Sequence, residues 1–160
     1  MNTTLKALLA QEDELRFENF NNEDALQLGL LITKIAREEI KKGVALHIEY
    51  DECPLFTHYM EGTSGNNIYW VNAKKNVVKK FGNSSLYIGE MYKNEGTTFH
   101  EATKLPSTEF QAEGGSFPLI IRGQGRIGSV TVSGLTSQED HELAVEGIKR
   151  YLGIKSDKIL

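Results

Sequence analysis

The stretch over residues 117–134 constrains the fold more than any other part of the chain. It reads FPLIIRGQGRIGSVTVSG, in which two apolar runs are separated by the four residues GQGR. The second run alternates between apolar and small residues, which is the period of a strand with one buried face. Two strands joined by so short a glycine-containing connection pair as an antiparallel hairpin. We therefore predict strands over 117–122 and 127–134, with a turn over 123–126.

The glycines of this stretch also match a nucleotide-binding pattern. Gly123, Gly125 and Gly128 have the G-x-G-x-x-G spacing of dinucleotide-binding proteins. That function requires a helix after the glycines, because the N-terminus of the helix faces the pyrophosphate. The alternating residues SVTVSG follow instead. A hairpin explains the spacing better, since glycine adopts the positive φ values of tight turns without strain.

Four segments repeat apolar residues at the spacing of an amphipathic helix. They are 3–14, 23–42, 67–81 and a closing segment from Thr136 to about Tyr151. A shorter helix is predicted over 86–93. Thr136 and Glu139 have the spacing of a capping box at the start of the last helix. Gly43, after two lysines, is typical of the end of the second helix.

The remaining strands follow from alternation. Residues 44–51 alternate between apolar and polar side chains, which predicts a strand with one buried face. Residues 55–61 form a second strand, antiparallel to the first if 51–54 is a hairpin turn, and 15–20 form a short one. The stretch 94–116 has no readable period, and a long irregular segment in a small protein often carries function. This order of elements favours an α+β fold, with helices packed on a mostly antiparallel sheet.

The composition excludes several classes of protein. The 160 residues carry 18 Lys+Arg and 22 Asp+Glu, a net charge of −4, so no general field attracts nucleic acid or an anionic membrane. One cysteine excludes a disulfide framework and a cysteine-rich zinc site. The sequence contains neither a signal-peptide pattern nor an apolar run of about 20 residues that could span a membrane. We therefore expect one cytoplasmic domain over residues 1–160.

The histidines and the cysteine predict neither a metal site nor a nucleophile. The four histidines, His47, His58, His100 and His141, contain no pair spaced to share one helix face. His47 and His58 could approach each other across a hairpin, but zinc sites need three or four ligands. Cys53 follows two acidic residues, which raise the pKa of a thiol and make the thiolate rarer.

Lys74 is the charged residue whose position is hardest to explain as plain surface. It lies four residues from both Trp70 and Val78, and hence on the apolar side of the predicted helix 67–81. A lysine at such a position either extends its ammonium group to solvent or points into a pocket to meet an anionic group. Both interpretations remain open at this point.

Two further features carry the same kind of ambiguity. Gly114 and Gly115 allow a ligand or another chain to approach the backbone closely, or they form a turn before the next strand. His141 lies in the first turn of the last helix, where unpaired N–H groups can bind an anion. Asp140 already supplies negative charge there, which favours plain capping.

The C-terminal half of the chain resembles the haem-degrading domain family, also called HbpS-like or GlcG-like. The resemblance is carried by Gly114, Gly115, Pro118, Gly128, Val132, Ser133, Gly134, Gln138 and Asp140. It is strongest to a branch in which a Trp-x-x-Arg-Lys helix precedes two serines, here Trp70, Lys74, Ser84 and Ser85. This chain departs from the branch at Ala73, where the pattern has Arg, so an Arg-Lys pair is missing. The resemblance extends from about residue 20 to the end.

The resemblance implies a profilin-like fold, in which helices flank a five-stranded antiparallel sheet. It also implies assembly into a homo-oligomer, and some relatives bind haem. The implied ligand site lies between the helix 67–81, the serine pair and the glycine pair. Its candidate residues are Trp70, Lys74, Ser84, Ser85, Gly114, Gly115, Phe117 and His141. No recognisable haem-ligating histidine transfers onto the sequence, and the C-x-x-C-H motif of covalent haem attachment is absent.

Two hypotheses from different classes follow. In the first, the protein is an oligomer that binds a small anionic or haem-like ligand, with Lys74 on a carboxylate and with Trp70 and Phe117 as apolar walls. In the second, it is a structural homo-oligomer without a ligand, and Trp70 and the glycine pair lie at a subunit interface. An enzyme acting on a small anionic metabolite is a third hypothesis, for which the sequence shows no nucleophile–base pair.

Overall fold

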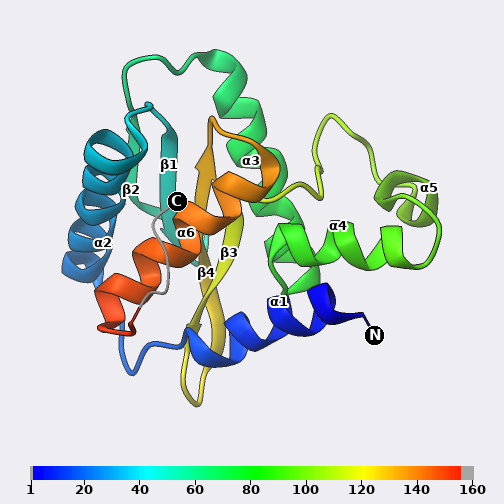
Figure 1. Cartoon of the computed structure of the whole chain (residues 1–160), viewed down its shortest axis with the longest axis horizontal. Coiled ribbons are helices and arrows are strands. Elements are labelled where there is room, and N and C mark those ends of the chain that lie inside the picture. Colours follow the sequence, from blue (N-terminus) through cyan, green and yellow to red (C-terminus); the bar gives the residue numbers. More distant parts are fainter. Residues whose placement is uncertain (1, 156–160) are drawn as a thin grey trace.

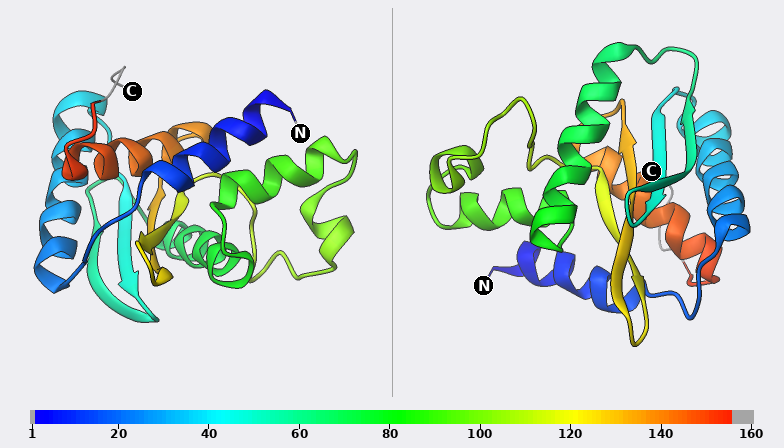
Figure 2. Two further views of the ribbon diagram at one scale, coloured as in Figure 1. Left: turned by 90° about the horizontal axis from the view of Figure 1, so that it is seen from below. Right: turned by 180° about the vertical axis from the view of Figure 1, so that it is seen from behind.

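Within residues 2–155, which the computed structural model describes, four strands form one antiparallel sheet. The strands are β1 (Ala45–Tyr50), β2 (Cys53–Tyr59), β3 (Ser116–Ile121) and β4 (Gly125–Ser133), in the order β2-β1-β4-β3. The helices are α1 (Thr3–Glu14), α2 (Asn22–Ile35), a π-helical turn η1 (Ala36–Ile40), α3 (Gly65–Phe81), α4 (Ser85–Asn94), α5 (Phe99–Thr103) and α6 (Ser137–Leu152). Figures 1 and 2 show α2 and α6 on one face of the sheet and α3 on the other. This arrangement is the predicted α+β fold.

The glycine-rich stretch forms the predicted hairpin. β3 and β4 pair antiparallel on either side of it, and the chain continues as a strand where a nucleotide site would need a helix. Gly123 and Gly125 have φ values of 81° and 89°, in the left-handed region that favours glycine. Gly128 has a different role, because a Cβ atom there would lie 1.9 Å from the carbonyl oxygen of Glu49 on β1. The third glycine therefore allows β4 to pack closely against its neighbouring strand.

The prediction of a fifth strand is wrong. Residues 15–20 form a single parallel bridge, in which the Phe17 N–H donates to the Ile120 carbonyl and the Arg122 N–H donates to the Phe17 carbonyl. The ladder stops there because the chain turns away into α2, whose N-terminus is capped by Asn21. Alternation in this segment reflects burial of Leu15 and Phe17 in the core rather than strand pairing.

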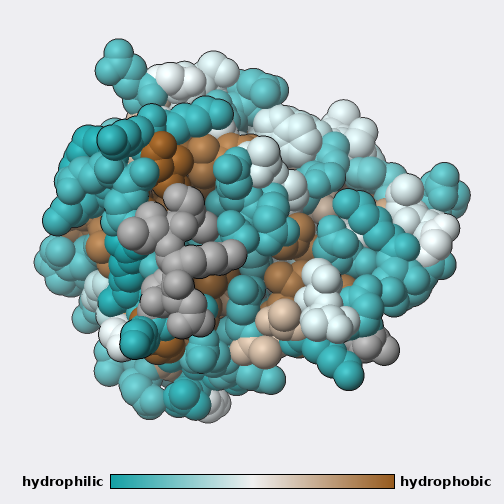
Figure 3. Space-filling model, viewed as in Figure 1, coloured by the Kyte–Doolittle hydropathy of each residue, from teal (hydrophilic) through white to brown (hydrophobic). Residues whose placement is uncertain are grey.

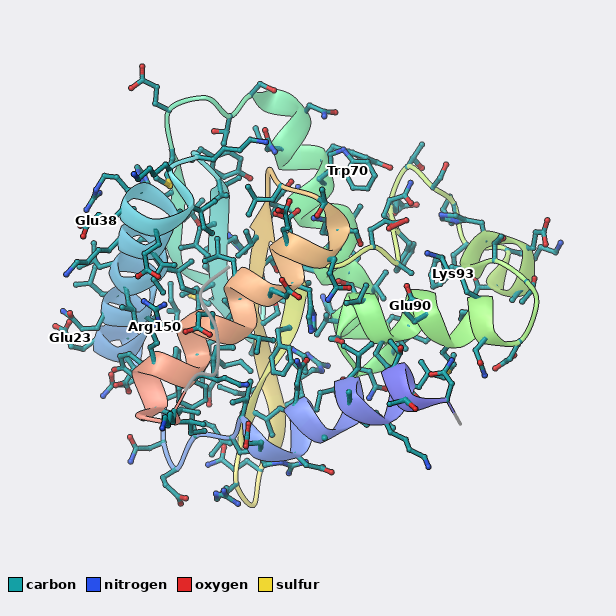
Figure 4. All side chains as sticks on the ribbon, in the orientation of Figure 1. Glu23, Glu38, Trp70, Glu90, Lys93 and Arg150 are labelled. Carbon is teal, nitrogen blue, oxygen red and sulfur yellow. The ribbon has the colours of Figure 1, made fainter. Side chains whose placement is uncertain are left out.

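The predicted helix 23–42 also ends differently. Its α-helical part stops at Ile35, a π-helical turn follows, and Lys41 ends it in the left-handed conformation. A Cβ atom at Gly43 would lie 2.0 Å from the Glu61 carbonyl oxygen, so a glycine is needed where the chain passes this backbone on its way into β1. Arg150 of α6, labelled in Figure 4, holds the π-helical turn by a two-pronged ion pair with Glu39, with one N–O distance of 2.7 Å.

The other helix predictions are confirmed within a few residues, and one helix was missed. Segments 3–14, 67–81 and 86–93 correspond to α1, α3 and α4, and α6 begins with the expected Thr136 capping box. The helix α5 lies inside the stretch 94–116, which the sequence left irregular. Thr98 caps it, and Phe99 packs edge-to-face against Phe81 and Tyr92.

Two groups of buried apolar side chains hold the elements together. The larger one lies between the sheet and the helices α2 and α6, and includes Leu28, Ile32, Leu46, Val132 and Leu143. The second lies between α1, α3, α4 and α5, and contains Leu5, Leu8, Val77, Leu86 and Phe99. On the face shown in Figure 3 the surface is largely hydrophilic, with apolar side chains visible in patches between the helices. No helix within residues 2–155 is long and apolar enough to cross a bilayer.

Replacing Gly128 by Ala tests the close approach of β4 to β1. We expect Gly128→Ala to lower the free energy of unfolding by about 1–3 kcal/mol, because the added methyl group meets backbone that cannot rotate away. Urea unfolding followed by circular dichroism measures the change. Gly65→Ala is the control, since nothing lies within 4 Å of its Cβ position, and we expect a neutral or slightly stabilising effect. Equal stability of the two variants would contradict the interpretation.

Candidate functional site

A cavity of about 380 Å³ lies where α3 and α6 begin. Its lining residues come from the first half of α3, the end of β4, the connection into α6 and the segment before β3: Asn66, Asn67, Trp70, Lys74, Glu113, Ser133, Gly134, Leu135, Ser137 and Asp140. The volume lies in the range of small-molecule sites. Figure 4 shows Trp70 extending from α3 on the side of the molecule where α6 starts.

Two capping boxes place the N-termini of both helices at this cavity. Ser64 and Asn67 cap α3 reciprocally, and Thr136 and Glu139 do the same for α6. The Asn67 side chain also donates a hydrogen bond of 3.1 Å to the Ser133 hydroxyl, which fixes α3 to the end of β4. The N-terminal end of a helix carries partial positive charge. The cavity is therefore polar and faces two positive helix ends.

Lys74 and Asp140 form an ion pair at this cavity, although both residues are almost fully buried. The Lys74 Nζ atom lies 2.8 Å from Asp140 Oδ2 and 3.2 Å from the Val132 carbonyl oxygen, and the two residues are 3% and 2% exposed. Lys74 thus points inward, and the anionic group it meets is a carboxylate of its own chain. Its ammonium group also lies 5.9 Å from the centroid of the Trp70 ring.

The energetics of this pair depend on burial. Burial raises the pKa of Asp140, and the neighbouring Lys74 opposes that shift. The second carboxylate oxygen, Oδ1, accepts a hydrogen bond of 2.9 Å from the Leu135 N–H. The free-energy cost of removing two charges from water offsets much of the attraction between them.

The glycine pair makes room for Lys74. A Cβ atom at Gly115, whose φ is 139°, would lie 2.8 Å from Lys74 Nζ and 2.3 Å from the Val132 carbonyl oxygen. A Cβ atom at Gly114 would lie 2.1 Å from the Ser137 carbonyl oxygen, and the Gly114 N–H donates to the Ser137 hydroxyl. Both glycines are buried against their own chain. Gly114 therefore allows α6 to pack against this segment, and Gly115 allows Lys74 to do so.

The serine pair lies away from the cavity. The Ser84 hydroxyl caps α4 by accepting from the Tyr87 N–H, and the Ser84 N–H donates to Glu12 of α1. The Ser85 hydroxyl binds the backbone N–H and carbonyl groups of Ser116 on β3. Both serines are fully buried, and neither is among the cavity residues. They fix α4 to α1 and to the sheet.

His141 and Phe117 also face away from the cavity. Phe117 is fully buried in the main core. His141 is 1% exposed, and its Nε2 atom lies 2.7 Å from the side-chain oxygen of Gln11 on α1. Its Nδ1 atom has no hydrogen-bond partner among the described residues. Burial lowers the pKa of His141 to about 4, so the ring is neutral near pH 7 and offers no positive charge to an anion.

His47 and His58 do not approach each other. In the hairpin of β1 and β2, His47 aligns with Thr57 and His58 aligns with Leu46. Successive residues of a strand point to opposite faces, so the two histidines lie on opposite sides of the sheet. No group of three or more His, Cys, Asp or Glu side chains in the described part of the chain could hold a metal ion.

A second polar network occupies the sheet face near β2. His47 lies 2.8 Å from both Thr57 Oγ1 and Glu49 Oε1, and Lys75 of α3 donates to the same carboxylate over 3.1 Å. The hydrogen bond with His47 lowers the pKa of Glu49 to about 2, and Lys75 adds to the effect. All four side chains therefore have partners, and the network fixes α3 over the sheet.

The structure brings together Trp70 and Lys74, with Gly115 behind the lysine. Sequence reasoning missed Glu113, the asparagines of the first turn of α3 and the role of Asp140 as the partner of Lys74. The capping signals that place both helix N-termini were readable. Their meeting at one cavity was not, because 66 residues separate Lys74 from Asp140.

Sequence comparisons identify relatives over nearly the whole chain. The model of a family described as haem degrading protein HbpS-like matches residues 20–149. A UPF0303 protein of Streptomyces coelicolor is 39% identical over 150 residues, which is 94% of each chain. A UPF0303 protein of Psychromonas ingrahamii is 38% identical over 145 residues, or 91% of each chain.

Solved structures share the fold. The crystal structure of the Ybr137w protein matches with a TM-score of 0.85 and 27% identity, covering 96% of this chain and 90% of that one. HbpS matches with a TM-score of 0.66 and 14% identity, covering 86% of this chain and 93% of that chain. A structure described as a PduOC:Heme complex matches with a TM-score of 0.68 and 15% identity, covering 87% and 99%. At such identities the last two comparisons establish the fold alone.

Removing one partner of the buried ion pair tests its contribution to stability. We expect Lys74→Met to lower the free energy of unfolding by about 3–5 kcal/mol, because Asp140 is left buried and unpaired. The loss of unfolding free energy in the double variant Lys74→Met/Asp140→Leu should be about 1–3 kcal/mol smaller than the summed losses of the single variants Lys74→Met and Asp140→Leu. Urea unfolding of all four proteins measures this coupling. Lys80→Met, at an exposed position of α3, is the control, and additive losses would contradict the coupling.

The buried histidine predicts a loss of stability in mild acid. The pKa of His141 is about 4 when folded, against an ordinary value of 6.5, so only the unfolded chain gains this proton between these pH values. Its stabilising contribution is complete above pH 6.5 and is lost as the pH falls towards 4, a total of about 3 kcal/mol. Urea unfolding at pH 7 and pH 4.5 should show a smaller pH dependence for His141→Gln than for the wild type. Identical pH dependence in the two proteins would contradict this assignment.

Proposed function

The chain belongs to the HbpS-like haem-degrading protein family, and from this premise we propose that it binds a small polar ligand in the cavity between α3 and α6. The observation that carries the proposal is the placement of the Lys74–Asp140 ion pair. Both side chains are almost fully buried, yet both line a cavity of about 380 Å³ that is open to a small molecule. A structural ion pair has no need of such a cavity beside it.

The lining indicates the chemistry of the ligand. A lysine ammonium group has three N–H donors, and Asp140 and Val132 occupy two of those of Lys74. The third is left for an oxygen atom of the ligand. Trp70 supplies an apolar wall on which a flat group can stack. The ligand is therefore a compact molecule with a planar apolar part and one oxygen-bearing end.

The charges of the cavity limit how acidic the ligand can be. The positive charge of Lys74 is matched by Asp140, and Glu113 adds a further carboxylate to the wall. The positive ends of α3 and α6 are each worth about half an elementary charge, so together they balance Glu113 and leave the cavity close to neutral. Neutral ligands and monocarboxylates fit this balance better than ligands with several negative charges.

Haem does not fit the residues of this cavity. PduOC is described with haem bound, and haem iron in proteins is held by His, Cys, Met or Tyr side chains. None of these residue types is among the described residues that line the cavity. Its one amine, on Lys74, is engaged with Asp140. The proposal therefore keeps a small ligand and leaves haem out.

The other expectations from the sequence and from the family resemblance remain parts of the proposal. They are a profilin-like classification of the fold, one domain over residues 1–160, a cytoplasmic location and assembly into a homo-oligomer. A ligand-free structural oligomer is the alternative, with Trp70 at a subunit interface. Burial of Gly114 and Gly115 against their own chain removes one of the contacts on which that alternative was based.

Fluorescence of Trp70, the only tryptophan of the chain, tests the proposal directly. We expect saturable changes on titration with benzyl alcohol and with benzoate, because both present a ring to Trp70 and an oxygen to Lys74. Glu113→Gln should tighten benzoate binding about fivefold, since a like charge is removed, and leave benzyl alcohol unchanged. Hemin should produce no saturable shift of its Soret band.

The exposed Lys80→Met variant is the control, and it should bind both ring compounds as the wild type does. Absence of saturation with both compounds would refute ligand binding at this cavity. A saturable Soret shift with hemin would instead refute the exclusion of haem.

A further inference from the structure

We propose that Lys74 is a reactive amine that forms an imine with a small aldehyde or ketone in this cavity. The inference rests on the proposed function, because the carbonyl compound has to enter the same cavity. It goes beyond that function by assigning a covalent step to one side chain.

The position of Lys74 supports this chemistry. Its amine is withdrawn from bulk water, at 3% exposure of the residue, and still lines the cavity. Gly115 packs closely behind Nζ, where a side chain would displace the amine, because a Cβ atom there would lie 2.8 Å from the nitrogen. Trp70 lies beside the amine, with its ring centroid 5.9 Å from Nζ, and can hold a planar carbonyl compound next to the nitrogen.

Asp140 supplies the acid–base partner that imine formation needs. Only a neutral amine is a nucleophile, and burial is the usual way in which proteins produce one from lysine. Asp140 Oδ2, at 2.8 Å, can take the proton from Lys74, and burial favours the protonated carboxyl group. The Leu135 N–H holds the other oxygen, so that Oδ2 stays directed at the amine.

The step balances without an oxidant or reductant. The lone pair of the Lys74 nitrogen forms a bond to the carbonyl carbon while the C=O π bond breaks, and a proton passes from nitrogen to oxygen through Asp140. Asp140 then protonates the hydroxyl group, which leaves as water as the C=N bond forms. The products are a protonated imine on Lys74, a carboxylate on Asp140 and one water molecule. The site thus exchanges one ion pair for another of the same charge.

The neighbouring lysines of α3 lack these features. Lys75 is held by Glu49 over the sheet. Lys79 pairs with Glu52 at the surface, and Lys80 is exposed. None of the three lines the cavity between α3 and α6. Lys80, on the same helix, is therefore an internal reference for the ordinary reactivity of a surface amine.

Reductive trapping of the wild-type chain tests the inference. Benzaldehyde is added with cyanoborohydride, which reduces a protonated imine to a stable secondary amine, and the modified lysines are located by peptide mass spectrometry. We expect Lys74 to be modified at least about tenfold faster than Lys80, because the ring is held beside its amine. Benzyl alcohol, which has the same shape without a carbonyl group, should protect Lys74 and leave Lys80 unaffected.

The two proposals fail in different ways. If Lys74 is modified no faster than Lys80 while benzyl alcohol still changes Trp70 fluorescence, the imine is refuted and ligand binding stands. If benzyl alcohol neither binds nor protects, and Lys74 is unreactive, both proposals fall.

The variant Asp140→Asn examines the acid–base role. We expect at least about tenfold slower trapping of Lys74 relative to Lys80, with an unchanged circular dichroism spectrum. A folded variant that is trapped at the wild-type rate would refute the role of Asp140. If the variant does not fold, the comparison of Lys74 with Lys80 in the wild type still decides the inference.

Discussion

The contact between Lys74 and Asp140 joins parts of the molecule that lie on opposite faces of the sheet. α3 and α6 cover different faces of the sheet, and this pair joins the middle of α3 to the first turn of α6. Local features surround the contact: Gly115 packs against Lys74, and the Leu135 N–H, in the turn after Ser133, donates to Asp140. The geometry of the cavity depends on all of them.

Local patterns were sufficient to predict the elements whose signals lie within a few residues. The capped helix after Thr136 and the hairpin around Gly123 are examples. Tertiary contacts decided the rest. Residues 15–20 alternate because they cross the core, and the π-helical turn after Ile35 is held by the ion pair of Glu39 with Arg150 of α6. The same holds for the site. Helical spacing predicts that Lys74 lies near Trp70, whereas its partner Asp140 is 66 residues away in the sequence and was not predictable from local patterns.

Membership of a family named for haem does not require a haem site in every member, because function depends on side chains placed on a shared fold. The solved structures that match this chain share its fold. The described residues that line the cavity supply an amine, two carboxylates and an indole, and none of them is a histidine, cysteine, methionine or tyrosine.

The helix α1 has a consequence for how the chain can be divided. The family match begins at residue 20, after α1 has ended. Gln11 and Glu12 nevertheless reach His141 and Ser84, and Leu5 and Leu8 are buried against the second apolar cluster. A fragment cut at the boundary of the match would open this cluster and strip two buried polar groups of their partners. The folding unit thus includes α1 and is larger than the segment 20–149 that the family model matches.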